Sequence, residues 1–376
     1  MRSLLSSKSA ILATTLLTGA VASAHAMDVK MYGQVNKALV GYDDGQNTDF
    51  GVVDNDLSST RFGVKGEQKL DNGLTASLVY EVEMQSNPSN FLVQNNDPAN
   101  SASPLNQNNA GVANGNVGFD ERHASVGLSG DFGGVVLGQT AMASDGILTQ
   151  DLVGAQDVMN SDYEKLGGGL NFRTGAGALS GVTMASMTSN GGTYRTDAVR
   201  YDSPKLAGFS AKASIAQGGD TEAAVLYEGK VADFKLKGAA SVGFNNDLPT
   251  TTATNNYDQR YIASGSILHS SGIGATAAYT TDKLRDGVAG SDPTQWYLKA
   301  GYAWDAYEIA ADYGQSNHYG NAVLSDNKLN VIGVGAQYNM GHGVSVAGLY
   351  RNMDANRSGT DLQNVDLFAA NMRVKF

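Results

Sequence analysis

The sequence predicts an all-β protein, a transmembrane antiparallel β-barrel of sixteen strands. Three observations predict this fold. Stretches of about ten residues that alternate apolar and polar side chains recur along the chain after residue 26. No later window holds the run of about 18 apolar residues that a membrane-spanning helix needs. Tight Gly/Asn/Asp turns alternate with longer polar loops, as in a barrel with short periplasmic turns and long external loops.

The first 26 residues differ from the rest and predict a secretory signal peptide. Arg2 and Lys8 precede an apolar run at residues 10–20, and the segment ends on Ala24-His25-Ala26, a small-x-small cleavage site. The apolar run is too short for a membrane anchor. We therefore expect cleavage after Ala26, export to a Gram-negative cell envelope, and a mature barrel over residues 27–376.

Residues 295–304 show the alternation most clearly. Trp296, Leu298 and Ala300 share one face, which suits lipid, whereas Gln295 and Lys299 share the other, which suits water. Residues 233–244, 307–313 and 368–376 repeat the pattern. A soluble β-sandwich also alternates, but the many alanines and glycines on the apolar faces would leave cavities in a close-packed core.

The predicted strands follow one another with regular spacing. They cover residues 29–42, 57–70, 74–86, 119–131, 135–140, 194–203, 208–217, 222–229, 234–244, 258–270, 273–281, 295–304, 307–315, 329–339, 343–352 and 366–376. Residues 43–56 are expected to form a long polar loop. Residues 169–188 also resemble a hairpin, and if that hairpin joined the wall the barrel would have eighteen strands. Either number encloses a lumen.

Composition excludes several classes of function. The chain has 26 Lys+Arg against 37 Asp+Glu, a net charge of −11, which argues against a nucleic-acid partner. There is no cysteine, and the five histidines form no cluster with metal-ligand or catalytic spacing. We therefore expect no enzyme activity, no cofactor and no metal.

Several motifs together resemble the general diffusion porins of Gram-negative outer membranes. They are MYGQVN at residues 31–36, STRFGVKGEQKLDNGLTASLVYEVE at 59–83, ERHASVGLSGDFGGVVLGQ at 121–139, RTDAVRYDSPKLAGFSA at 195–211, and the terminal RVKF. The resemblance implies a homotrimer of sixteen-stranded barrels in contact with outer-membrane lipid and lipopolysaccharide. The terminal Phe376 resembles the signal that such barrels present to their assembly machinery.

The same resemblance implies that the third external loop, residues 141–193, folds inward and narrows the pore. Its carboxylates would face a ladder of basic residues on the opposite wall, with Arg61 and Arg122 as wall arginines. The candidate acids of this constriction loop are Asp145, Asp151, Asp157, Asp162 and Glu164.

Alternation gives an independent prediction for the wall residues. Phe62 and Val64 share the outward phase, so Arg61 and Lys65 face the lumen. Arg200 alternates against Val199 and Tyr201 and is also expected to face inward, near the periplasmic rim. Turning Arg122 inward also turns Val126 and Leu128 inward, which indicates either a β-bulge or a strand at a subunit interface.

These features predict a water-filled channel for passive diffusion of small hydrophilic solutes and ions. The acidic balance favours weak cation selectivity. A substrate-specific channel and a structural or adhesive surface barrel are the alternatives. A conductance measurement distinguishes a structural or adhesive barrel from both kinds of channel.

Overall fold

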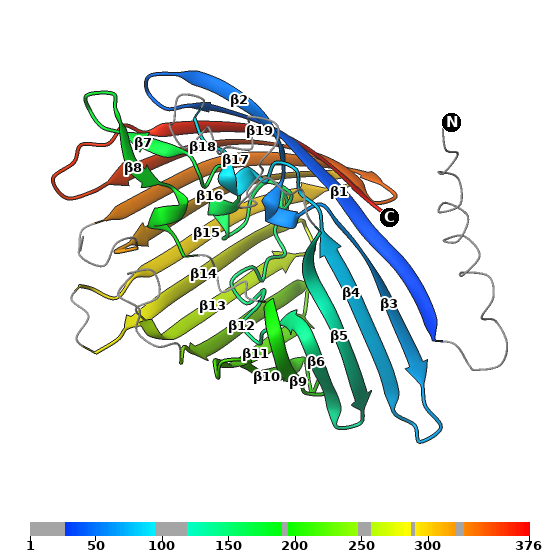
Figure 1. Ribbon diagram of the computed structural model, residues 1–376. Coiled ribbons are helices and arrows are strands. Elements are labelled where there is room, and N and C mark those ends of the chain that lie inside the picture. Colours follow the sequence, from blue (N-terminus) through cyan, green and yellow to red (C-terminus); the bar gives the residue numbers. More distant parts are fainter. Residues whose placement is uncertain (1–26, 95–118, 190–194, 247–256, 287–289, 320–326) are drawn as a thin grey trace, which may run out of the picture.

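The structure is a computed structural model that describes residues 27–94, 119–189, 195–246, 257–286, 290–319 and 327–376. The predicted signal peptide lies outside the described residues. The chain forms a closed, tilted β-barrel, in which successive strands pair antiparallel around the wall (Figure 1). Among the described residues, no helix is long and apolar enough to cross a membrane.

The described residues form nineteen strands and four short 3-10 helices. The strands are β1 (Asp28–Asp43), β2 (Thr48–Asp54), β3 (Arg61–Lys69), β4 (Thr75–Glu83), β5 (Asp120–Gly130), β6 (Gly133–Ala141), β7 (Asn171–Arg173), β8 (Leu179–Thr183), β9 (Arg195–Asp202), β10 (Phe209–Ala216), β11 (Thr221–Val231), β12 (Phe234–Phe244), β13 (Tyr257–His269), β14 (Ile273–Leu284), β15 (Thr294–Trp304), β16 (Tyr307–Asn317), β17 (Lys328–Gly341), β18 (Val344–Asn356) and β19 (Val365–Lys375). The 3-10 helices are η1 (Asp56–Ser58), η2 (Ser89–Phe91), η5 (Tyr163–Lys165) and η6 (Ala185–Met187).

The barrel closes between its first and last strands. β1 pairs with β19 along one edge, from Gln34 opposite Lys375 to Asp43 opposite Asp366. Its other edge pairs with β3 at residues 28–34 and with β2 at residues 37–43. Because β2 and β3 occupy one place in the wall, the barrel has sixteen strand positions, as the sequence predicts.

The segment expected as a loop at residues 43–56 is partly wall, which corrects that expectation. Asp44 Oδ1 accepts hydrogen bonds from the backbone N–H groups of Gln46 and Asn47, which closes a tight turn between β1 and β2. Phe50 and Val52 then alternate outward, 63% and 64% exposed. Residues 55–60 leave the wall, and the strand position resumes at Arg61.

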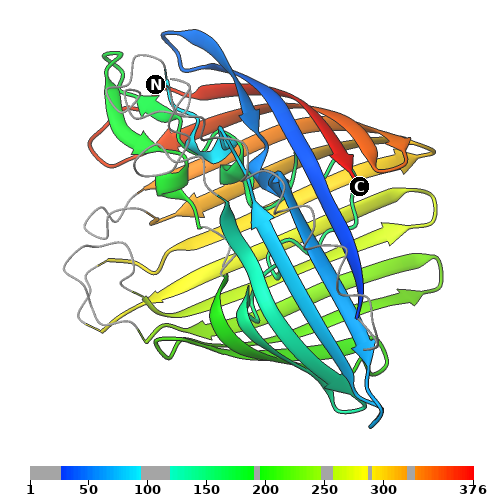
Figure 2. The ribbon, with the colours of Figure 1, turned by 45° about the vertical axis from the view of Figure 1, so that its right-hand side comes forward.

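The hairpin expected near residues 169–188 forms, but it does not join the wall. β7 and β8 form a separate two-stranded sheet, and in the sequence they belong to the connection between β6 and β9. Figure 2 shows this hairpin at one rim of the barrel. The eighteen-stranded alternative is therefore wrong.

Candidate functional site

The first part of the connection between β6 and β9 lies inside the barrel and follows the inner wall. We call this connection the constriction loop. Five of its backbone N–H groups donate, in chain order, to inward side chains of five wall strands, at 2.7 to 3.1 Å. The accepting side chains are those of Ser214 on β10, Glu222 on β11, Ser266 on β13, Glu308 on β16 and Gln337 on β17. The loop therefore has a fixed path along the inner wall from β10 to β17.

Apolar side chains fill the lumen on one side. Loop residues that include Met159, Leu170 and Phe172 are fully or almost fully buried, in one cluster with inward residues of the wall. The wall contributes Val40 and Tyr42 of β1, Leu329 and Val331 of β17, Leu349 and Met353 of β18, and Val365 and Leu367 of β19. This side of the lumen is a packed hydrophobic core, which we call the packed side.

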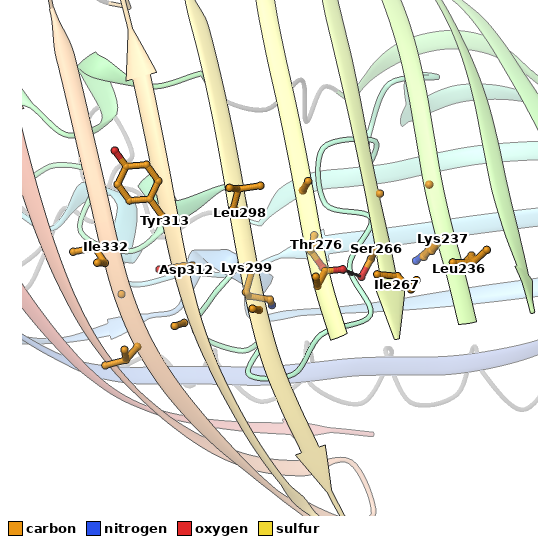
Figure 3. A pocket seen from close by; sticks show the side chains of 18 of the residues that line it. Leu236, Lys237, Ser266, Ile267, Thr276, Leu298, Lys299, Asp312, Tyr313 and Ile332 are labelled. Atoms are coloured by element: carbon orange, nitrogen blue, oxygen red, sulfur yellow. Dashed lines mark hydrogen bonds between the residues drawn. The ribbon is translucent and has the colours of Figure 1, made fainter. Parts of the chain in front are cut away.

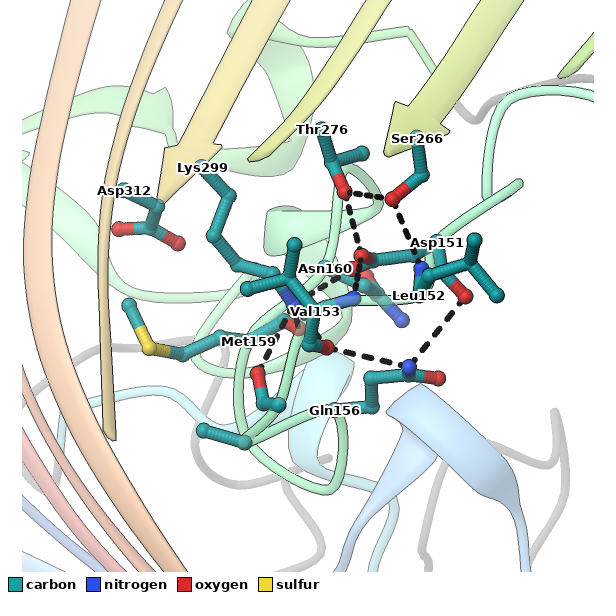
Figure 4. A network of polar contacts seen from close by, with 12 residues as sticks. Asp151, Leu152, Val153, Gln156, Met159, Asn160, Ser266, Thr276, Lys299 and Asp312 are labelled. Carbon is teal, nitrogen blue, oxygen red and sulfur yellow. Dashed lines mark hydrogen bonds and ion pairs between the residues drawn. The ribbon is translucent and has the colours of Figure 1, made fainter. Parts of the chain in front are cut away.

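A buried lysine fixes the middle of the loop (Figure 4). The Lys299 ammonium on β15 lies 2.5 Å from Asp151 Oδ2 and donates to the carbonyl oxygens of Val153, Gly154 and Met159 at 3.1 to 3.2 Å. Asp151 Oδ1 also accepts from the Thr276 hydroxyl on β14, at 2.5 Å. Asp151, a predicted pore acid, is therefore bound to the wall and points away from an open passage.

Asp157, another predicted pore acid, is bound to the wall in the same way. Its carboxylate pairs with Arg373 of β19 and accepts from the Ser345 hydroxyl of β18. Its carbonyl oxygen accepts from the Asn55 amide at 2.7 Å. The side chain is fully buried, so it also lies away from an open passage.

A polar cavity of about 460 Å³ remains between the loop and the opposite wall. Nine charged residues line it. The basic ones are Arg61 of β3, Arg122 of β5, Lys165 of η5 and Arg195 of β9, and the acidic ones are Asp56, Glu83, Asp120, Asp145 and Asp162. We call this the open side. Of the predicted residues, it brings together Arg61, Arg122, Asp145 and Asp162.

The wall arginines of the open side share carboxylates of β4. Arg122 Nε lies 2.7 Å from Glu81 Oε1, and its Nη1 pairs with Glu83. Arg61 Nε lies 3.6 Å from Glu81 Oε2, and its remaining polar contacts, to Ser58 and Ser59, are 3.3 Å or longer. Arg61, whose side chain is 25% exposed, is the less tightly paired of the two and the better placed to meet a solute.

A β-bulge explains how Arg122 can line the cavity. Glu81 pairs with His123 and Val82 pairs with Glu121, so Arg122 is the extra residue on β5. The bulge shifts the phase, which leaves Val126 and Leu128 exposed on the outer face and Ser125 buried. Of the two explanations that the alternation allows, the bulge is the one the structure contains.

Two ion pairs join loop residues of the cavity to residues outside the loop. Asp145 Oδ2 lies 3.4 Å from Arg195 Nη2, and Asp56 Oδ2 lies 3.3 Å from Lys165 Nζ. Burial raises the pKa of Asp162 above its usual range. For Lys165, burial opposes the charged form, but the Asp56 carboxylate and the neighbouring acidic side chains together outweigh it and raise the pKa.

Glu164, the fifth predicted acid, is buried beside the cavity without lining it. Neither of its carboxylate oxygens has a hydrogen-bond partner among the residues that the structure describes. Burial and, next, the negative charge of Asp162 raise the pKa of Glu164 well above its usual range. Its proton, rather than an ion pair, makes this burial tolerable.

The two other predicted basic residues lie apart from the cavity. Lys65 is on the same face of β3 as Arg61, four residues further along, with its ammonium 5.3 Å from the centre of the Tyr32 ring. Arg200 Nη2 pairs with Asp202 Oδ2 at 3.0 Å on its own strand, and its Nη1 donates to the Ala141 carbonyl at 2.7 Å. The contacts of both side chains are therefore with residues of the barrel wall.

Sequence reasoning did not select Glu81, Glu83, Lys165 or Arg195 as site residues. Glu81 and Glu83 alternate with Tyr80 and Val82, so the period of two in β4 was a usable signal for inward carboxylates. Arg195 begins β9 and Lys165 lies in a 3-10 turn. Arg195 shares the outward phase of Val199 and Tyr201, so the alternation in β9 does not select it, and the turn at Lys165 has no period of two.

The outer face carries a separate apolar hollow of about 820 Å³ across β11–β17 (Figure 3). Small residues such as Gly265, Ala277 and Ala300 line it, among exposed Ile267, Leu298 and Ile332. These residues have the outward phase, so the hollow lies on the other side of the wall from the constriction loop.

Comparison with known proteins agrees with this architecture. Residues 13–358 match the family model described as Gram-negative porin. The major outer membrane protein P.IB of Neisseria gonorrhoeae is 26% identical over 216 residues, 56% of this chain and 48% of that protein, and P.IB of Neisseria lactamica is 25% identical over 215 residues, 56% and 50%. The chain thus spans about half the length of the curated relatives it matches.

Solved structures share the fold at lower identity. An anion-selective porin from Comamonas acidovorans is 16% identical, with a TM-score of 0.62 over 93% of this chain and 100% of that one. The trimer form of OmpT, an outer membrane protein of Vibrio cholerae, is 14% identical, with a TM-score of 0.58 over 93% and 100%. With the family model covering most of the residues, this chain belongs to the Gram-negative porin family of the outer membrane.

Proposed function

We propose that the protein forms a water-filled channel for the passive diffusion of small hydrophilic solutes and ions across the outer membrane. The observation that carries the proposal is the charged cavity of about 460 Å³ inside a closed barrel. Its lining is polar on both the wall and the loop, whereas the rest of the loop is packed against the wall. Diffusion down a gradient needs no energy source.

The charges of the open side create a transverse field. Arg61 and Arg122 lie on the wall, and Asp145 and Asp162 lie on the loop. Opposed charges across a narrow, low-dielectric passage orient dipolar solutes and separate the paths of anions and cations. Five acids against four bases in the lining favour a weak preference for cations.

The test is single-channel recording in planar bilayers with a potassium chloride gradient. We expect open channels whose reversal potential indicates a weak cation preference. Arg61→Ala should strengthen that preference, and the double variant Asp145→Asn/Asp162→Asn should weaken it. Lys205→Ala, at an exposed position outside the cavity, is the matched control. A protein that inserts but never conducts contradicts the proposal.

A solute-specific channel is the second candidate, and the size of the constriction loop favours it. The loop fills one side of the lumen and leaves a cavity lined by nine charged residues. A specific channel should be blocked by one charged solute at low concentration, and a general channel should not. Block of ion current by small carboxylates, amines and zwitterions, each titrated separately, distinguishes the two.

The assembly that we propose is a homotrimer in the outer membrane, in contact with lipid and lipopolysaccharide. The trimer form of the structurally similar OmpT supports it. Export would use residues 1–26, with cleavage after Ala26, and Phe376 would be presented to the barrel assembly machinery. N-terminal sequencing of the mature protein and its molar mass in mild detergent test these points.

A further inference from the structure

Lys299 has an unusual environment for a lysine. Its side chain is completely buried, and its ammonium has one carboxylate and three backbone carbonyls as partners. The three carbonyls belong to Val153, Gly154 and Met159, so the loop turns around a single cation. An unpaired buried charge is costly, and the ion pair and the three hydrogen bonds of this ammonium all go to the constriction loop.

The turn around Lys299 also needs support from the wall. Ala155 has a φ of +61°, in the left-handed region that disfavours non-glycine residues, and its N–H donates to Glu308 Oε2 at 2.8 Å. The Thr276 and Ser266 hydroxyls bind Asp151 and the Leu152 N–H. These contacts all reach residues 151–159. Lys299 is the wall residue that binds the backbone carbonyl oxygens of this turn.

The position of this turn decides how much of the lumen stays open. Residues on both sides of it, Thr149 and Asn160, line the open cavity, while Val153 and Met159 are buried against the wall. The turn is held against the wall, between two residues that line the cavity. Release from the wall therefore moves it into the passage.

We propose that Lys299 is a positioning residue that sets the width of the passage by holding residues 151–159 against the wall. This inference rests on the proposed channel function. Without the ammonium, Asp151 is a buried carboxylate with no counter-ion, and it reaches water only by turning toward the lumen. Loss of Lys299 therefore narrows the passage and adds a negative charge to it.

The first test compares Lys299→Met with Lys237→Met by single-channel recording. Lys237 lies on β12 and has no ion pair with the loop among the described contacts, so its variant controls for loss of a lysine from the wall. We expect Lys299→Met to conduct less than the wild type, with frequent partial closures and a stronger cation preference. Lys237→Met should keep the wild-type conductance and stay free of closures.

Two further variants separate the freed carboxylate from the lost lysine. Asp151→Asn leaves the ammonium its three carbonyls, so we expect conductance near that of the wild type. The double variant Lys299→Met/Asp151→Asn has no orphan charge, and its closures should be fewer than in Lys299→Met. Equal effects of the single Lys299 variant and the double variant would overturn the role of the freed carboxylate.

A second measurement does not depend on conductance. The chain has no cysteine, so Val153→Cys introduces a unique thiol at a position that is 1% exposed. We expect a membrane-impermeant thiol reagent to modify this cysteine at least about tenfold faster when Lys299 is also changed to Met. Heat-modifiable mobility in electrophoresis identifies folded barrels, and only those are scored.

The outcomes for the inference and for the channel are distinct. If the wild type conducts, and Lys299→Met has the conductance, selectivity and thiol reactivity of the wild type, the inference is overturned and the channel stands. If the wild type does not conduct but the thiol reactivity rises as expected, the loop attachment stands and the proposed channel fails.

Discussion

The packed side and the open side of the lumen show opposite uses of the same inward strand positions. On the packed side, inward positions of β17–β19 carry Leu329, Leu349 and Leu367, which bury against the loop. On the open side, β3 and β5 place Arg61 and Arg122 inward. The rule that a barrel's inner face is polar thus holds where the face meets the cavity, and fails where the face meets protein.

The difference is also visible in how charges are paired. Arg351 and Asp312 on the packed side have side chains no more than 1% exposed, and their closest N–O distance is 2.6 Å. Arg61 on the open side is 25% exposed, with its nearest carboxylate oxygen 3.6 Å away. Charges on the packed side hold the structure, whereas those on the open side remain available to a solute.

The largest expected effect is on a buried ion pair of the packed side. Arg351→Met leaves Asp312 as a buried charge without its partner and should lower the free energy of unfolding by about 3–5 kcal/mol. Arg61→Met, on the open side, should change it by about 1 kcal/mol or less. Urea-induced unfolding in detergent micelles measures both. Equal losses would remove the distinction between the two sides.

The next effect is on apolar packing. Leu367→Ala creates a cavity at a fully buried inward position, and we expect a loss of about 2–5 kcal/mol. Leu298→Ala, at a position 49% exposed on the outer face, removes the same atoms without enclosing a cavity and should cost less. The same unfolding assay compares the two, and a larger cost for Leu298→Ala would contradict a packed inner core.

The pH dependence should come from the loop beside the open side. Because the folded-state pKa of Glu164 is raised, the folded protein keeps this proton at a pH where the unfolded chain has lost it. Stability should therefore fall as the pH rises above the ordinary glutamate value of 4.5. Glu164→Gln should reduce the slope of unfolding temperature against pH, whereas Glu228→Gln, at an exposed position, should leave it unchanged.

The smallest effect is expected away from both sides. Lys205 and Glu228 form an ion pair at 3.3 Å, with side chains 53% and 67% exposed. Such pairs contribute about 0–1 kcal/mol, and less in high salt. Lys205→Ala should therefore unfold within about 1 kcal/mol of the wild type, and a larger loss would mean that exposure is a poor guide to the importance of a charge here.

The strands could be predicted from sequence because lipid imposes a period of two on the outer face. Phe234, Leu298 and Phe368, on three different strands, all have the outward phase. Most strands of the wall could therefore be predicted one by one. β2 was missed because Asp44 and Asp54 made its surroundings resemble a polar loop. On β17, Ile332 faces outward and its neighbours Leu329 and Val331 face inward. Apolar residues in both phases indicated that the inner face is apolar on this strand.

The site was harder to predict than the wall because the constriction loop has no period. Charge type alone did not separate Asp145 and Asp162, which line the cavity, from Asp151 and Asp157, which bind Lys299 and Arg373. That distinction depends on which wall residue each acid meets. Such contacts join residues more than a hundred positions apart in the chain.

The most direct test of the account asks on which side of the lumen ions pass. Thr149→Cys places a thiol in the lining of the open side, and Ala369→Cys places one on the packed side, where Ala369 is 7% exposed. A methanethiosulfonate reagent should reduce single-channel conductance in Thr149→Cys and leave Ala369→Cys unchanged. Block of Ala369→Cys with no effect on Thr149→Cys would contradict the account.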